Sequence, residues 1–200
     1  KRQFADNVII QIKNGPIDFQ PREPFSPLFG QLYNTPMMME FQITQEYLGF
    51  SNHLVYHGTT YEECLDSDTY RDGKGSTVAK MVKAIAGVAN TGQEPNFCGY
   101  IFAQSNWYAF GRLAWNPTLS AEQIADEWAR QTFIKPKGMT STAYEQKFLI
   151  PVKDMMMSSR ETAVNYMMPL GFHHIFGGSH YGPGPVSYTH LRAHETKANL

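Results

Sequence analysis

Short apolar runs rich in β-branched residues occur in the first half of the chain and predict buried strands. Each run is too short for a helix and is bounded by residues that favour turns, which is typical of strands in a parallel sheet. The predicted strands cover residues 7–12 (NVIIQI), 37–45 (MMMEFQITQ) and 85–90 (IAGVAN). A proline-rich loop separates the first two strands, and residues 77–84 fit one or two helical turns. Residues 47–70 fit neither pattern.

The second half of the chain is predicted to be helical, because its apolar positions recur at helical spacing. Pro117 ends the first of these helices, since the residue before a proline avoids the helical region. Ser120 and Gln123 have the spacing of a capping box and predict the start of the next helix. Pro151 is expected to kink or break the last one. The predicted helices cover residues 102–115, 120–133 and 144–168.

Strands that alternate with helices and then give way to helices alone indicate an α/β fold with a parallel sheet. Three strands are too few to close a barrel or to bury both faces of an open sheet. The chain also begins with Lys1 rather than with an initiator methionine. We therefore expect a truncated chain that holds the last strands of a larger barrel, followed by an all-helical segment.

The composition narrows the classes of function. The net charge is −1 and the basic residues are scattered, which argues against nucleic-acid binding through phosphate contacts. Two cysteines, Cys64 and Cys98, form neither a disulfide framework nor a metal-binding pair, and they fit a reducing compartment. No segment approaches the roughly 18 apolar residues that span a bilayer. Residues 186–200 are polar and without an apolar period; they resemble a translated adapter sequence and are left out of the fold prediction.

Two acids follow two successive predicted strands. Asp18 comes just after the first strand and Glu46 stands at the end of the second. Chemistry in parallel α/β folds lies beyond the carboxyl ends of the strands, so the two carboxylates could orient and deprotonate one water molecule. Lys13, at the end of the first strand, could bind a carboxylate of a ligand. The alternatives are a turn cap for Asp18, a surface ion pair for Glu46 and a solvated side chain for Lys13.

Histidines near the C-terminus raise the question of a metal. Adjacent histidines point apart, and no carboxylate at helical spacing completes a ligand set with His173, His174 and His180, so no metal site is predicted.

Several long blocks of the chain resemble the α-glucuronidases of glycoside hydrolase family 67. The blocks are NVIIQIKNGPIDFQPREP, MMEFQITQEYLGF, CLDSDTY, AGVAN, FAQSNWYAFGRLAWNP, MMMSSRE, NYMMPLGFHHI and HYGPGP, and they cover about residues 1–185 in the family's order. The resemblance implies the C-terminal part of a (β/α)₈ catalytic TIM barrel over residues 1–116. It implies the start of a helical, dimer-forming domain over residues 117–185, and residues 186–200 remain a non-native tail.

The resemblance also implies a reaction. This is inverting hydrolysis of the α-1,2 bond between 4-O-methylglucuronic acid and the terminal xylose of xylo-oligosaccharides (aldouronic acids). Asp18 and Glu46 correspond to the acids that activate water, and Lys13 to a lysine that holds the uronic acid carboxylate. Neither a metal nor an organic cofactor is implied, and the expected partners are these oligosaccharides and a second copy of the full-length protein. A cytoplasmic location is expected.

The family's general acid lies on a strand upstream of Lys1. We therefore expect the 200-residue chain to be inactive by itself. In the family the helices after the barrel pack beside the mouth of the active site, so the resemblance also implies that Arg160, His173 and His180 could line it. Structural roles in packing and hydrogen bonding are the favoured prediction for these three residues. Two other hypotheses remain open: a non-catalytic carbohydrate-binding or assembly module, and a barrel glycosidase that acts on neutral sugars. An upstream strand that ends in glutamate would distinguish the enzyme from the binding module.

Overall fold

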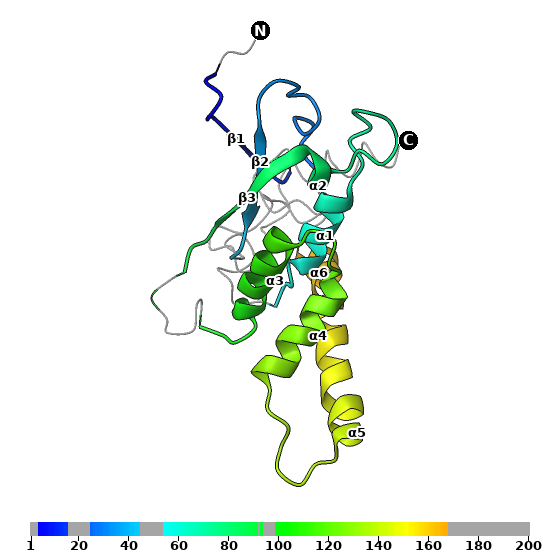
Figure 1. Cartoon of the computed structure of the whole chain (residues 1–200). Coiled ribbons are helices and arrows are strands. Elements are labelled where there is room, and N and C mark those ends of the chain that lie inside the picture. The colour runs from blue at the N-terminus through cyan, green and yellow to red at the C-terminus, as the bar shows by residue number, and fades with distance from the viewer. Residues whose placement is uncertain (1–3, 16–24, 45–53, 92, 94–98, 168–200) are drawn as a thin grey trace, which may run out of the picture.

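The computed structural model describes residues 4–15, 25–44, 54–91, 93 and 99–167, and within them the chain forms a mixed α/β fold (Figure 1). Three strands pair in parallel in the order β1-β2-β3, which confirms the predicted parallel sheet. The strands are β1 (Ile10–Lys13), β2 (Met37–Gln42) and β3 (Val82–Val88). The helices are α1 (Gly58–Asp66), α2 (Val78–Met81), α3 (Ala103–Trp115), α4 (Ala121–Thr132), α5 (Ser141–Tyr144), the π-helix η1 (Glu145–Leu149) and α6 (Ile150–Met167). None of these described helices is long and apolar enough to cross a membrane.

Helices α1 and α3 cover one face of the sheet. Side chains alternate between the two faces of a strand, and those of Ile12, Met39 and Phe41 are buried on the covered face. The ring of Phe41 lies 4.5 Å from that of Tyr61 on α1. On β3, a Cβ atom at Gly87 would lie 2.8 Å from the ring of Phe110, so the missing side chain allows α3 to approach the strand.

The strand boundaries differ from the sequence prediction. Strand β1 lies at 10–13 rather than 7–12, and β2 ends at Gln42 rather than at residue 45. Strand β3 begins at Val82, inside the segment that was predicted to be helical. Only Val78–Met81 forms a helix there, because Val82 pairs with Met37 of β2 and tertiary pairing outweighs local helical preference.

The predicted helices are confirmed in their positions. The backbone N–H of Gln123 donates to Ser120 Oγ at 3.1 Å, and the backbone N–H of Ser120 donates to Gln123 Oε1 at 3.3 Å, which completes the capping box. The expected irregularity at Pro151 is a π-helical turn, η1, directly before it. A proline ring collides with the carbonyl one turn earlier in an α-helix, and the wider turn relieves that contact.

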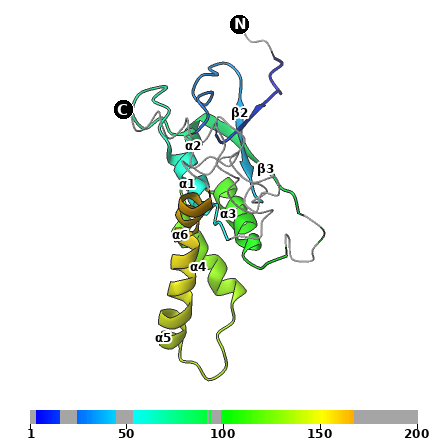
Figure 2. The same cartoon turned by 180° about the vertical axis from the view of Figure 1, so that it is seen from behind.

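Helices α4 and α6 lie side by side and form an arm that projects away from the sheet (Figure 2). Helix α1 joins this arm to the sheet. The hydroxyl of Tyr56, just before α1, donates to the carbonyl of Ala121 at the start of α4, at 3.0 Å. One continuous cluster of buried residues therefore extends from Ile12 in the sheet to Met156 in the arm.

Candidate functional site

The three strands end at the same edge of the sheet, which we call the carboxyl edge. Lys13 ends β1 with an exposed side chain, Gln42 ends β2 and Val88 ends β3. Backbone pairing continues one residue further, since Asn14 donates to Glu40 at 3.1 Å and Ile43 donates to Val88 at 2.8 Å. The described chain therefore leaves β1 and β2 on the side where parallel α/β folds place their chemistry.

Of the three predicted site residues, the structure describes Lys13. Asp18 and Glu46 lie outside the described residues, as do His173, His174 and His180. Their predicted roles stay predictions. Among the described residues, no group of three histidine, cysteine, aspartate or glutamate side chains could hold a metal ion.

Lys13 belongs to a polar row on the sheet face opposite to α1 and α3. It stands beside Glu40 in the register of β1 and β2, and Glu40 stands beside Ala86 of β3. The side-chain amide of Gln11 donates to Glu40 Oε2 at 2.7 Å. This face therefore carries charged and amide groups next to small residues. Gln11 and Glu40 were not predicted as site residues. The signal for them was the alternation of polar with apolar positions in QIK and MEFQ.

Buried polar groups also lie along the carboxyl edge. Asn14, Ser26, Gln42 and Thr44 are all buried. The carbonyl of Asn14 accepts from the backbone N–H of Ser26 at 3.0 Å, and Thr44 Oγ1 accepts from the backbone N–H of Asn90 at 3.0 Å. These bonds fix the backbone where it leaves β1 and β2.

Two side chains of α1 reach the same edge. The hydroxyl of Tyr61 donates to the carbonyl of Gln42 at 2.6 Å, and the thiol of Cys64 lies 3.6 Å from the carbonyl of Asn14. Burial, with a smaller contribution from Glu63, raises the pKa of the Cys64 thiol to about 12. Burial raises the pKa of Tyr61 well above its ordinary value too. Both groups are therefore neutral structural donors and not nucleophiles.

Asn106 of α3 holds the segment that leads into α1. Its Nδ2 donates to the carbonyl of Val55 at 3.0 Å, and its Oδ1 accepts from the backbone N–H of His57 at 2.8 Å. Between these bonds, the backbone N–H of Tyr56 donates to Ser159 Oγ of α6 at 2.8 Å. Residues 55–57 are thus held by two helices that come much later in the chain.

His57 is buried at this junction, and its Nε2 meets no hydrogen-bond partner among the described residues. Burial, and secondarily the charge of Arg160, lowers the pKa of His57 to about 4, so the imidazole is neutral near pH 7. Arg160 is itself buried; it forms an ion pair with Glu63 and reaches the carbonyl of Thr59 at 3.4 Å. Arg160 therefore ties α6 to α1, which is the structural role that the sequence analysis favoured.

Comparison with known proteins places this architecture in a class of glycoside hydrolases. The domain model described as "Glycosyl hydrolase family 67 middle domain" matches residues 1–97. The model described as "Glycosyl hydrolase family 67 C-terminus" matches residues 98–197. Together they cover nearly the whole chain, and the chain belongs to glycoside hydrolase family 67.

Curated proteins similar to this chain include fungal proteins named as α-glucuronidases. The chain is 42% identical to "Alpha-glucuronidase A" of Emericella nidulans and 43% identical to "Probable alpha-glucuronidase A" of Aspergillus flavus. A third relative, "Probable alpha-glucuronidase A" of Aspergillus niger, is 40% identical. In each case the similarity covers 92% of this chain and 22% of the relative. The chain thus spans about a fifth of the length of these relatives.

Proposed function

We propose that the protein to which this chain belongs is an α-glucuronidase. It inverts the anomeric centre while it hydrolyses the α-1,2 bond between glucuronic acid, or its 4-O-methyl form, and the terminal xylose of xylo-oligosaccharides. The family assignment and the names of the relatives support the reaction class. The observation that carries the proposal is the position of Lys13, exposed at the carboxyl end of β1 on the polar face of a parallel sheet.

The proposed mechanism divides the work between three residues. Lys13 binds the carboxylate of the uronic acid through a charge-assisted hydrogen bond, which orients the sugar. Asp18 and Glu46 orient a water molecule and accept its proton as the oxygen attacks the anomeric carbon. In an inverting enzyme a separate acid protonates the departing xylose oxygen. The family resemblance assigns that acid to an upstream strand, so the 200-residue chain by itself is proposed to be inactive.

The architecture proposed for the whole protein follows from the same assignment. Strands β1–β3 are the last strands of a (β/α)₈ barrel, and residues 117–185 begin a helical domain that pairs with a second copy of the protein. The parallel strand order and the polar face that carries Lys13 support the barrel, whose interior this face would line. The proposed location is cytoplasmic.

Lys13→Ala in the full-length protein tests the proposal. Removing one charge-assisted hydrogen bond is expected to lower kcat/KM for aldouronic acids by about 10- to 100-fold, mostly through KM. Activity on a substrate whose carboxylate is replaced by a hydroxymethyl group should be low and unchanged. Lys74→Ala, which removes an exposed lysine distant from the carboxyl edge, is the matched control.

The two acids are tested in the same assay. Asp18→Asn and Glu46→Gln are each expected to lower kcat by about 100-fold or more with little change in KM, because water activation serves the transition state. Full activity in either variant contradicts the assigned mechanism. An unchanged preference for carboxylate substrates in Lys13→Ala contradicts the role assigned to Lys13. A full-length protein that hydrolyses neutral substrates as well as aldouronic acids favours a glycosidase for neutral sugars, and one without any hydrolysis favours a binding module.

A further inference from the structure

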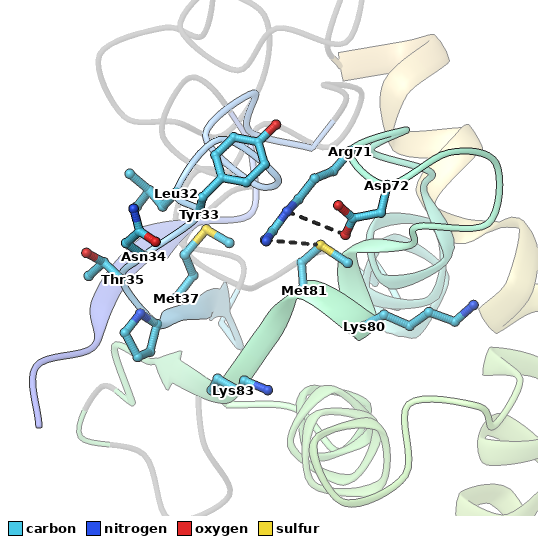
Figure 3. Close-up of a pocket in the computed structure, with 11 residues that line it drawn as sticks. Leu32, Tyr33, Asn34, Thr35, Met37, Arg71, Asp72, Lys80, Met81 and Lys83 are labelled. Carbon is cyan, nitrogen blue, oxygen red and sulfur yellow. Dashed lines mark hydrogen bonds and ion pairs between the residues drawn. The ribbon is translucent and has the colours of Figure 1, made fainter. Parts of the chain in front are cut away.

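A polar cavity lies at the edge of the sheet opposite to the carboxyl edge, where the strands begin (Figure 3). It has a volume of about 400 Å³, within the range of sites for small molecules. Its walls are the segment that enters β2, the turn at Arg71 and Asp72, and the start of β3. We call it the basic pocket and define it by Tyr33, Asn34, Arg71, Asp72, Lys80 and Lys83.

The charges around the basic pocket favour an anion. Three cationic side chains and one carboxylate line it. The ammonium of Lys80 donates to the carbonyl of Gly75 at 2.7 Å, which fixes its position. Lys83 is exposed and enters from β3, on a different wall from Arg71 (Figure 3). A ligand in the cavity would therefore meet positive charge from more than one side.

Arg71 is held in place but is poorly supplied with acceptors. Its guanidinium carbon lies 4.6 Å from the centroid of the Tyr33 ring, and Nη1 lies 3.7 Å from the sulfur of Met81, which is a weak acceptor. Its buried Nε forms a long ion pair with Asp72 Oδ2, at 3.5 Å, and has no hydrogen-bond acceptor among the residues that the structure describes. A guanidinium has five N–H donors, and a buried donor without an acceptor is costly. The Arg71 side chain is 21% exposed, so an anionic ligand in the cavity can accept from its accessible N–H groups.

The turn that carries Arg71 is ordered by its own hydrogen bonds. The carboxylate of Asp68 accepts from the backbone N–H of Tyr70 at 2.8 Å and of Gly75 at 2.6 Å. Tyr70, directly before Arg71, has a positive φ of 54°, which non-glycine residues seldom adopt. Backbone strain of this kind is found where surrounding bonds impose a geometry that serves binding. Arg71 is therefore presented in a fixed orientation before any ligand arrives.

We propose that the basic pocket binds a sugar that bears a carboxylate, with Arg71 and Lys83 on the carboxylate and Tyr33 and Asn34 beside the sugar ring. Arg71, Lys80 and Lys83 outweigh Asp72, which is 61% exposed, so the pocket carries an excess of positive charge that a carboxylate reduces. An aromatic ring next to amide and hydroxyl groups suits a sugar. The preference for an anion depends on the pocket alone; the choice of a sugar acid rests on the proposed function.

The test is a titration of glucuronic acid into the 200-residue chain, measured by calorimetry and by saturation-transfer NMR. Glucose and inorganic phosphate are the comparison probes. Arg71→Ala is expected to weaken glucuronic acid binding about 10-fold or more, because charge-assisted hydrogen bonds are lost. Asp72→Asn should strengthen it several-fold by removing the competing carboxylate. Lys74→Ala, an exposed lysine in the same turn, should bind like the unaltered chain.

The outcomes separate this inference from the proposed function. Binding that survives Arg71→Ala but is lost in Lys13→Ala belongs to the carboxyl edge, and it overturns the inference while it supports the proposed function. If glucose binds as tightly as glucuronic acid, the pocket has no preference for an anion. If phosphate binds as tightly, the pocket has no preference for a sugar. Either result overturns the proposal. No binding to the unaltered chain at millimolar glucuronic acid also overturns it. Asp72→Asn keeps the test decisive if Arg71→Ala lowers the melting temperature, because a gain in affinity cannot come from unfolding.

Discussion

At the scale of single residues, the most unusual group is the imidazole of His57. It is buried between α1, α3 and α6, its ring lies 5.9 Å from that of Tyr61, and its Nε2 has no hydrogen-bond partner within the described part of the chain. Protonation would place a charge in an apolar environment beside Arg160, and both effects lower its pKa. The histidine is therefore a neutral packing residue near pH 7, and it destabilises the folded chain only at acidic pH.

His57 predicts a pH dependence of stability. Its folded pKa of about 4 lies below its ordinary value of 6.5, so the unfolded chain binds a proton first as the pH falls. Its contribution to stability is complete above about pH 6.5 and decreases between pH 6.5 and 4, by about 3 kcal/mol in total. The free energy of unfolding in urea, measured from pH 7 to 4, should fall less steeply in His57→Gln than in the unaltered chain. Equal slopes would contradict a buried neutral imidazole.

At the scale of elements, Asn106 shows how a helix far along the chain fixes a segment near the carboxyl edge. Helix α3 packs against β3 on one side and holds residues 55–57 on the other. The backbone at Val55 and His57 belongs to no helix or strand. The carbonyl of Val55 and the N–H of His57 therefore depend on the side-chain amide of Asn106 for their hydrogen bonds. A buried backbone without such partners would be strongly unfavourable.

Asn106→Ala is expected to lower the free energy of unfolding by about 2–4 kcal/mol, because it leaves one buried donor and one buried acceptor without partners. Ser105→Ala is the matched control, since Ser105 is equally buried but donates only within its own helix, to Phe102 at 2.7 Å. That control should lose about 1 kcal/mol or less. Urea denaturation of both variants provides the comparison, and similar losses would argue against a special role for Asn106.

The elements also show what the sequence could predict. Helix α4 was predictable because its start depends on Ser120 and Gln123, which are local in sequence, and α3 because its apolar period is regular. Helix α1 was missed: its first turn, Gly58-Thr59-Thr60, has weak helical preference, and the helix depends on contacts with the sheet and α4. The strand boundaries were shifted because register is set by partner strands and not by composition.

The candidate site was predictable only in part. The sequence led to Lys13 at the end of a strand, and the structure places it there. It did not lead to Glu40 or Gln11, whose importance depends on which face of the sheet they occupy. The basic pocket was also missed, since Tyr33, Arg71 and Lys83 come from three separate segments and no spacing rule connects them.

At the scale of the whole molecule, the two family domains share one core. The family models meet between residues 97 and 98, yet buried residues form one cluster across that boundary. Tyr56, Arg160 and Ser159 bind the sheet side to the helical arm through buried hydrogen bonds and an ion pair. The two parts are therefore expected to lose their structure together.

A single unfolding transition tests this expectation. In a Cys98→Ser variant, the only remaining thiol is Cys64, which is buried between α1 and the sheet. The three tryptophans, Trp107, Trp115 and Trp128, lie on α3 and α4 and report on the helical part. Labelling of Cys64 and the change in tryptophan emission should share one urea midpoint, as in a cooperative transition. Labelling at urea concentrations that leave the emission unchanged would show that the sheet opens independently.

The parallel order of the strands has a consequence for how the chain assembles. Ile10 pairs with Met37, and Met37 pairs with Val82, so no two strands can be joined by a tight hairpin. Each pairing must close a long loop, which is slow, whereas neighbouring helices such as α3 and α4 form from nearby residues. Strands that are synthesised first therefore stay unpaired until their partner strands have been synthesised. Misassembly would begin at these exposed strands, before pairing is complete.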